Sequence, residues 1–292
     1  MNSFELTQEH RDFPPHLRHF AWCPERIYLR GDIRTFRRGV GIIGARKATP
    51  YGKEAARIVA SWCAEFDIPV YSGAAMGCDQ AAHRGALEAG GDTVAVLGCG
   101  ADRYYPASAR DLIDRIVEQG CVASLMEWGA KPRKQSFVER NRLIVAMSYL
   151  LVVVEGRMPS GTFSAVNWAD QLNVDIAAVP GSIFSPESTG PNHLLSNGAV
   201  PIASKDDFMS ALALSIDYED TGEPLAIEDW ELQALDSNSR KIMHALRSGS
   251  LSIEAVGQCL DVPLIESMVA INILEVKGLV QRLDDGRFVA CT

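Results

Sequence analysis

Short apolar runs alternate with stretches of helical periodicity between Val40 and Leu214. The apolar runs are rich in Val and Ile and predict strands at 40–43, 69–72, 93–97, 121–125, 149–155 and 175–179. The stretches between them predict helices at 52–66, 80–89, 107–119, 136–147 and 163–172. This alternation is typical of βαβ units and of a parallel sheet covered on both faces. We therefore predict an α/β fold with a doubly wound, extended Rossmann-like sheet over residues 40–215, in which ligands bind at the carboxyl ends of the strands.

The two ends of the chain follow other patterns. Residues 1–39 show no clear periodicity and are expected to form a short irregular arm. Residues 216–231 are acidic and contain Gly and Pro, as expected of a linker. Beyond them, three short helical patterns are followed by two short strands flanking an Asp-Asp-Gly turn, at 237–247, 252–259, 263–277, 279–283 and 287–290. Three helices and a hairpin predict a small C-terminal winged-helix domain over 232–292.

The charge is unevenly distributed along the chain. The formal net charge is −9, but eight acidic residues and no Lys or Arg lie between Asp217 and Asp236, so the remainder is close to neutral. Two stretches are basic, at 26–47 and 131–142. Local patches rather than net charge set the field that a ligand meets, so a polyanionic partner is not excluded.

The cysteines and the apolar runs indicate the compartment. There are seven cysteines without a C-x-x-C pair, which argues against a disulfide framework or a zinc site and favours a reducing cytosol. The N-terminus is polar and unlike a signal peptide, and no apolar run is long enough to span a membrane. We expect a cytoplasmic protein.

Small residues follow most of the predicted strands. The first strand runs into Gly44-Ala45-Arg46-Lys47, and Thr49 suits the N-cap of the next helix, whose free N–H groups are expected to hold a phosphate. Arg46 supplies further donors for a phosphate or a plane for a base. Gly73 and the pair Ser160-Gly161 follow other strands. Together they predict a broad groove for an extended, phosphate-bearing chain.

A second candidate element is the segment Phe137-Val-Glu-Arg140-Asn141-Arg142. Arg140 and Arg142 are about 200° apart on a helix, so one is expected to reach the ligand and the other to serve structure. Phe137 is a candidate for stacking a base, and a position in the core is an equally good interpretation.

The sequence offers little for catalysis. Asp79 and His83 are four residues apart and follow Cys78, but no third metal ligand or oriented nucleophile accompanies them. We interpret Asp79 as a helix cap and His83 as a structural polar residue. We predict no catalytic residue, no metal and no cofactor.

Six ordered motifs closely resemble the DNA-processing protein A family, also called DprA or Smf. They are G-I-I-G-A-R (41–46), Y-S-G-A-A-M-G-C-D-Q-A-A-H-R-G-A-L (71–87), V-A-V-L-G-C-G-A-D-R-Y-Y-P (94–106), F-V-E-R-N-R-L-I (137–144), A-V-P-G-S (178–182) and G-P-N-H-L-L-S-N-G-A (190–199). The resemblance implies a non-enzymatic protein that protects incoming single-stranded DNA in natural transformation and loads the RecA recombinase. It also implies a homodimer through the Rossmann-like domain. Within the family's basic pocket it implies roles for Arg46, Arg110, Phe137, Arg140, Asn141 and Arg142.

Two other functions stay open. The same rim could hold one phosphorylated ribose, as in a small-nucleotide sensor or a phosphoribohydrolase-like enzyme, although the P-G-G-x-G-T run of such enzymes does not follow Pro180. A pure assembly factor with a vestigial pocket is the other. The winged helix is expected to contact protein rather than DNA, because its third helix carries Glu266 and Glu275 against Lys277 alone.

Overall fold

The computed structural model divides the chain into two compact units, Met1–Asp220 and Thr221–Thr292. The residues it describes are 2–158, 161–216, 242, 246, 250–260, 264–276, 280–283 and 286–290. Each unit has its own apolar core and is considered separately.

A nine-stranded sheet forms the centre of the first unit. Its spatial order is β1-β2-β6-β5-β4-β3-β7-β8-β9. The strands from β6 to β9 in this order are all parallel, and they are β3 (Gly39–Ile43), β4 (Val70–Ser72), β5 (Thr93–Leu97), β6 (Cys121–Ser124), β7 (Ser148–Val153), β8 (Asp175–Ala178) and β9 (Val200–Pro201). From β3 the chain first builds outward through β4, β5 and β6, then returns to place β7 on the other side of β3. The carboxyl ends of β3 and β7 therefore mark the topological switch point, where such sheets bind ligands.

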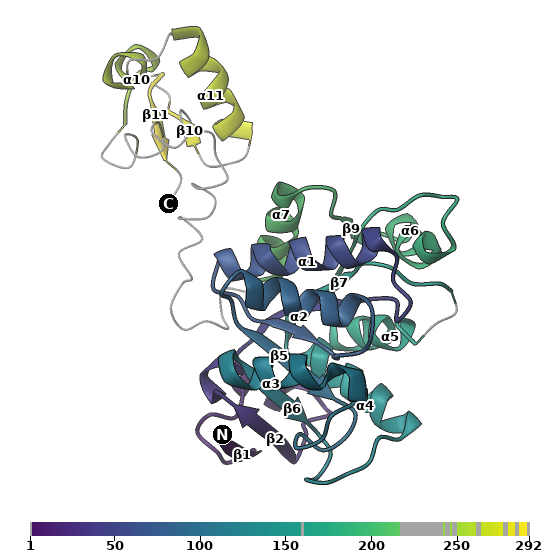
Figure 1. Ribbon diagram of the computed structural model, residues 1–292. Coiled ribbons are helices and arrows are strands. Elements are labelled where there is room, and N and C mark those ends of the chain that lie inside the picture. The colour runs from purple at the N-terminus through teal and green to yellow at the C-terminus, as the bar shows by residue number, and fades with distance from the viewer. Residues whose placement is uncertain are drawn as a thin grey trace. The chain divides into compact units, whose positions relative to one another are not determined.

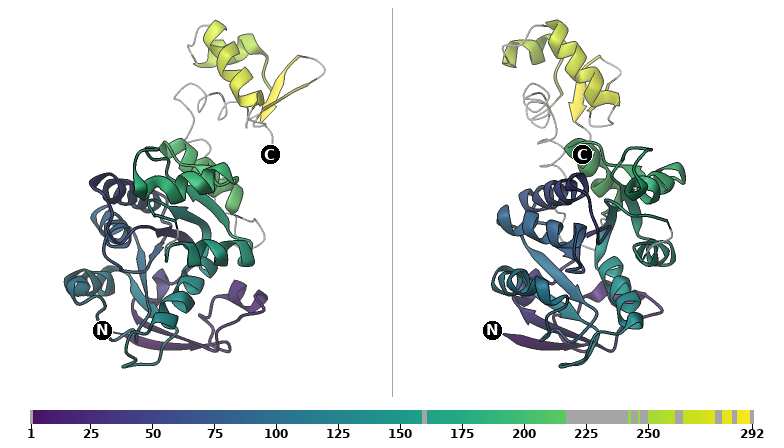
Figure 2. Two further views of the ribbon diagram at one scale, coloured as in Figure 1. Left: turned by 90° about the vertical axis from the view of Figure 1, so that its right-hand side faces the viewer. Right: turned by 45° about the vertical axis from the view of Figure 1, so that its right-hand side comes forward.

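Helices cover both faces of this sheet (Figures 1 and 2). On one face lie α1 (Pro50–Glu65), α2 (Cys78–Glu88) and α3 (Arg110–Gln119), and on the other α4 (Lys134–Ala146) and α5 (Phe163–Leu172). The strands between them are buried almost throughout, as expected for parallel strands between two layers. The predicted doubly wound α/β architecture is confirmed, with each of the six predicted strands within two residues of its observed bounds.

The first 39 residues are not an irregular arm, so that prediction is wrong. They contain β1 (Ser3–Thr7) and β2 (Arg26–Gly31), which pair antiparallel with each other and extend the sheet through β6. Leu6, Ile27 and Leu29 are fully buried. The apolar run of β2 is short and bounded by arginines, so periodicity alone does not reveal it; its burial comes from tertiary packing.

The end of the first unit also holds elements that the hydrophobic pattern did not resolve. They are α6 (Thr189–Ser196) and α7 (Lys205–Ser215), together with short 3-10 turns. Phe208 of α7 packs against Trp62 of α1, with ring centroids 5.8 Å apart. This contact ties the end of the unit to the helix that begins at the switch point.

The described part of the second unit fits the predicted order of elements. It contains α10 (Ile253–Leu260), α11 (Leu264–Val276) and a hairpin of β10 (Val280–Arg282) and β11 (Phe288–Ala290). Side chains from all four surround a small core that includes Val256, Leu274 and Phe288. Nearly all of the predicted linker and of the helix at 237–247 falls outside the described residues, so the winged helix stays a prediction.

Candidate nucleic-acid interface

A groove of about 840 Å³ opens at the topological switch point. It lies where β3 ends at Ile43 and its neighbour β7 ends at Val153, which are paired in the sheet. The loops after both strands line it, and α4 and the start of α5 form further walls. Its lining residues are Ile43, Gly44, Ala45, Arg46, Lys47, Ala75, Asp79, Tyr105, Lys134, Phe137, Val138, Arg140, Asn141, Gly156, Arg157, Gly161, Thr162, Ser164 and Glu187.

The lining of this groove is predominantly basic. Five cationic side chains face two carboxylates: Arg46, Lys47, Lys134, Arg140 and Arg157 against Asp79 and Glu187. One carboxylate is already neutralised, because Arg157 Nη2 lies 2.5 Å from Glu187 Oε1. Arg46 and Lys47 are exposed and make no ion pair with any described residue. They leave a positive field at the mouth of the groove, which suits a phosphate backbone.

Two aromatic rings stand beside these cations. Phe137 of α4 and Tyr105 have ring centroids 5.2 Å apart, and Tyr105 is exposed. The Arg46 guanidinium lies 5.7 Å from the centroid of Phe137. Phe137 is half-buried, so part of its side chain packs in the core and part is accessible to a base. Accessible rings next to cations without ion-pair partners are what a single-stranded nucleic acid needs for stacking and charge neutralisation.

Arg140 lies at the floor of the groove, where it supports the structure. It is 6% exposed, and its Nη1 donates to the carbonyl oxygens of Gly73 and of Val96, the latter at 2.8 Å. Burial lowers the pKa of this guanidinium, and the nearby Asp79 carboxylate opposes that effect. Arg140 thus ties α4 to the ends of β4 and β5. Its Nε is buried and has no hydrogen-bond partner among the described residues.

Arg142 and Arg110 lie outside the groove. The Arg142 guanidinium is held between Trp168, 3.7 Å from the ring centroid, and Trp22, at 4.6 Å. Burial lowers its pKa. Arg110 is the first residue of α3 and is exposed, with its guanidinium 4.8 Å from the Tyr104 ring. Neither lines the groove, so the structure does not bring these two predicted site residues together with Arg46.

The remaining predicted site residues shape the groove. Gly44 and Gly161 line it, and Asn141 Nδ2 donates to Ser164 Oγ at 2.7 Å across two helices. Gly73 is buried behind the groove, where a side chain would clash with the Arg140 guanidinium. Ser160 lies outside the described residues. These positions therefore contribute shape and backbone access rather than charge.

At the N-terminus of α1, where the sequence predicts a phosphate site, the carboxylate of Glu155 contacts the N-cap residue Thr49. Glu155, 1% exposed at the end of β7, accepts from Thr49 N at 2.9 Å and from Thr49 Oγ1 at 2.6 Å. Gly52 has no side chain, and a Cβ there would lie 2.2 Å from Glu155 Oε2. A carboxylate satisfies helix N-terminal amides and the dipole as a phosphate would. The exposed groove beside α1 is therefore the candidate binding surface.

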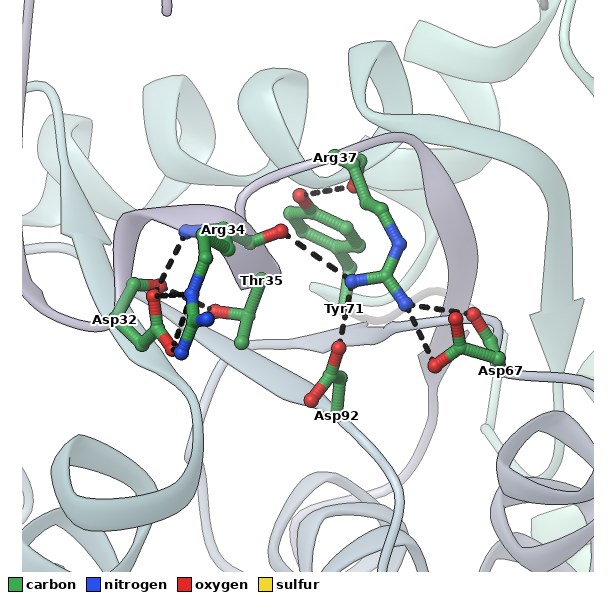
Figure 3. A network of polar contacts seen from close by, with 7 residues as sticks. All are labelled: Asp32, Arg34, Thr35, Arg37, Asp67, Tyr71 and Asp92. Carbon is green, nitrogen blue, oxygen red and sulfur yellow. Dashed lines mark hydrogen bonds and ion pairs between the residues drawn. The ribbon is translucent and has the colours of Figure 1, made fainter. Parts of the chain in front are cut away.

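The basic stretch at 26–47 is dispersed and largely paired. Arg37 contacts Asp92 at 2.6 Å and Asp67 at 2.9 Å, and Arg34 contacts Asp32 at 2.6 Å (Figure 3). This network lies at the amino ends of β3, β4 and β5, the edge of the sheet opposite the groove. The number of cations in this stretch thus overstates the charge available to a ligand. Of these cations, Arg46 and Lys47 line the groove.

The candidate chemistry near Cys78 is structural. Burial, with Asp79 and Glu155 nearby, raises the pKa of the Cys78 thiol to about 12, so it stays protonated. His83 is fully buried, with Nδ1 2.7 Å from Thr93 Oγ1. Burial and the positive charges of Arg140 and Arg84 lower its pKa to about 3. Asp79 accepts from Ala75 N at 3.3 Å, and burial raises its pKa. The structural role predicted for His83 agrees with these contacts, but the prediction of Asp79 as the helix cap is wrong, because Gly77 is the N-cap of α2 and Asp79 lies within its first turn.

Three groove residues were not singled out from the sequence. Lys134 opens α4, Tyr105 belongs to the 94–106 motif, and Arg157 follows β7. Each lies just beyond a predicted strand or at the start of a predicted helix. The rule that ligands bind at the carboxyl ends of strands could have selected them had it been applied to every loop.

The described residues contain neither a metal-binding cluster nor a membrane-spanning helix. No cluster of three or more His, Cys, Asp or Glu in this part of the chain could hold a metal ion. None of its helices combines the length and apolar character that crossing a bilayer requires.

Comparison with known proteins places most of the first unit in one family. Residues 5–213 match the family described as DNA recombination-mediator protein A. The "Putative DNA processing protein DprA" of Mycobacterium tuberculosis is 36% identical over 255 residues, covering 86% of this chain and 64% of that protein. The "DNA processing protein DprA" of Bacillus subtilis is 30% identical, covering 69% of each. The chain thus spans about two thirds of the length of these relatives.

Two solved structures are similar to the same region. DNA processing protein A from Streptococcus pneumoniae superposes with a TM-score of 0.67 at 30% identity, covering 70% of this chain and 73% of that one. The Helicobacter pylori protein gives 0.65 at 29% identity, covering 73% and 97%. The latter structure is described as showing a single-stranded DNA binding mode of that protein.

Proposed function

This chain belongs to the DNA recombination-mediator protein A family, and we propose that it binds single-stranded DNA in the groove at the switch point of its sheet. The family is one of DNA processing and recombination. The bound strand would be protected and handed to the RecA recombinase, in natural transformation or in homologous recombination more generally.

The observation that supports this proposal is that cations without ion-pair partners lie beside one exposed ring, Tyr105, and one half-buried ring, Phe137, in the same groove. Arg46 and Lys47 would contact phosphates, and Lys134 is exposed at the same mouth. Bases would stack on Phe137 and Tyr105, each contact contributing about 1–3 kcal/mol. Stacking on ring faces tolerates every base, so little sequence preference is expected.

We predict that Arg46→Ala weakens binding to oligo-dT by at least about tenfold, because it removes both a phosphate contact and the cation beside Phe137. Fluorescence anisotropy with labelled single and double strands of one length measures this. Arg34→Ala is the matched control, since Arg34 is also exposed but lies at the opposite edge of the sheet. Wild-type affinity should also fall with salt, with a slope of about −0.7 per phosphate neutralised.

Two results would contradict the proposal. Equal binding by the Arg46→Ala and Arg34→Ala proteins would place the DNA elsewhere. No binding of the wild type to single strands even at low salt would assign the groove to another ligand.

The alternative is a sensor or phosphoribohydrolase-like enzyme for a small nucleotide. It predicts saturable binding of a free nucleotide in place of the strand. Two observations count against it: Glu155 fills the helix end that would hold a phosphate, and the buried Cys78 and His83 are held in neutral forms. We therefore propose a non-catalytic role that uses no cofactor.

The remaining parts of the proposal rest on family membership. We propose a cytoplasmic homodimer through the Rossmann-like unit, RecA as its partner, and a winged helix that contacts protein. Light scattering in solution tests the dimer. RecA filament assembly on strands coated with a single-strand-binding protein, with and without this protein, tests delivery.

A further inference from the structure

A tight loop beyond β8 presents two apolar side chains to solvent. Ile183 and Phe184 are 82% and 89% exposed, the highest values among the large apolar residues of the described chain together with Leu214. Ile183 and Phe184 are neighbours and form one apolar patch on the loop, and exposed apolar patches are typical of interaction sites.

Hydrogen bonds anchor the loop before this tip and close a turn within it. Asn192 clamps Gly181, accepting from its N–H at 3.1 Å and donating to its carbonyl at 2.9 Å. Tyr51 of α1 donates to the Pro180 carbonyl at 2.6 Å. Within the loop, the N–H of Phe184 donates to Ser182 Oγ at 3.2 Å and that of Ser185 to the Ser182 carbonyl at 3.0 Å. The ring is therefore presented by an ordered turn.

The loop is also joined directly to the groove. Gly156, a groove residue, donates to the Glu187 carbonyl at 2.7 Å and accepts from Gly190 N at 2.8 Å. Since β3, β7 and β8 are adjacent, the loop after β8 is two strands from Arg46, roughly 10 Å at the usual spacing. An extended single strand covers that distance in a few nucleotides.

A second hollow lies between the groove and this loop. It measures about 440 Å³, and its lining consists of Thr49, Tyr51, Glu155, Pro180, Gly181, Ser182, Ser185 and Ser188. Hydroxyl groups of this kind contact sugars and phosphates. Glu155 repels a strand little, because its carboxylate is buried and already bonded to Thr49. The half-exposed Tyr51 ring borders the same hollow.

From this arrangement we propose that the Pro180–Ser185 loop is a second base-stacking platform, on which Phe184 and Tyr51 receive bases of a single strand leaving the groove across β7 and β8. This inference rests on the proposed function. The strand would then touch rings at both ends of its path, Tyr105 and Phe137 at one and Phe184 at the other, with Arg46 and Lys47 between them. The binding site is thus longer than the groove.

The test compares two lengths of oligo-dT against exchanges at Phe184. With an oligonucleotide of about 15 nucleotides, Phe184→Ala should weaken binding about five- to tenfold, and Phe184→Tyr should restore it. With one of about 4 nucleotides, which fills the groove alone, Phe184→Ala should bind like wild type. Leu214→Ala, on the equally exposed Leu214 of α7, is the control. None of these positions is buried, so folding is not at risk.

A local signal adds a direct readout. In Phe184→Trp protein, the added fluorescence over wild type should be quenched by the long oligonucleotide and unchanged by the short one. If wild type binds both oligonucleotides and Phe184→Ala is indistinguishable from it, the platform is refuted while the proposed function stands. If wild type binds neither, the proposed function itself fails. A change of oligomeric state in Phe184→Ala, measured by light scattering, would instead assign the loop to a second copy of the chain.

Discussion

At the scale of single residues, burial decides what each arginine of the first unit can do. Arg46 is exposed and unpaired in the described structure, Arg140 is buried on carbonyl oxygens, and Arg142 is enclosed by indole rings. An unpaired exposed guanidinium keeps all its donors for a phosphate, whereas a buried one is out of reach of an extended phosphate chain. The proposed DNA contact therefore falls on Arg46, and Arg140 acts by holding the groove floor in place.

His83 makes the stability of the first unit depend on pH. Its pKa is lowered to about 3 by burial, from about 6.5 in the unfolded chain. Between these values only the unfolded chain takes up the proton, so stability present at neutral pH is lost as the pH falls through this window. We expect His83 to contribute up to ~1.4 kcal/mol per pH unit to the loss. Urea unfolding at pH 7 and pH 5 measures it.

The matched variant for that experiment is His83→Asn, whose amide can still reach Thr93 Oγ1 but does not titrate. It should be less stable at pH 7 because it leaves space in the core, yet show a shallower dependence on pH. An unchanged slope would assign the acid sensitivity to other groups.

At the scale of elements, α4 joins the groove to the N-terminal strands. Phe137 and Asn141, one turn apart, face the groove, while Arg142 points to Trp22 in the segment between β1 and β2. Helical spacing correctly placed Arg140 and Arg142 on different faces of the helix. It could not show that Arg140 would bind backbone carbonyl oxygens, or that Arg142 would pack between two indole rings. Those partners come from segments 20 or more residues away in sequence.

Arg142→Ala should therefore destabilise the first unit without abolishing DNA binding. Loss of two cation–π contacts is expected to cost about 1–3 kcal/mol in the free energy of unfolding. Affinity for oligo-dT should stay within about twofold of wild type, because Arg142 is outside the groove. Urea unfolding and anisotropy measured on the same protein separate the two effects, with Arg142→Lys as the conservative control. A loss of affinity as large as that of Arg46→Ala would show that Arg142 contacts the strand.

The elements that the sequence predicted well are those whose own composition determines them. The Val- and Ile-rich strands from β3 to β8 are buried on both faces and read as continuous apolar runs. By contrast, β2 owes its place to pairing with β6, and Glu155 reaches the start of α1 because β3 and β7 are neighbours. Both depend on which strands lie side by side, which periodicity does not encode.

At the scale of the whole molecule, charge is distributed unevenly along the sequence. The groove cations belong to the first unit, whereas the acidic run from Asp217 to Asp236 precedes the predicted winged helix in the sequence. A basic recognition helix is what a winged helix needs to hold duplex DNA. The third predicted helix has Glu266 and Glu275 against Lys277, so it offers no such surface.

Deleting residues 232–292 should consequently leave single-strand affinity nearly intact. The first unit forms its own compact body with its own core, so it is expected to fold without them. Anisotropy with oligo-dT on the truncated and full chains measures the difference, and circular dichroism checks that the truncated chain is folded. Arg46→Ala in the truncated background should be as damaging as in the full chain, because both keep the same groove. A loss above about tenfold on truncation would place part of the DNA interface in the second unit and overturn this division.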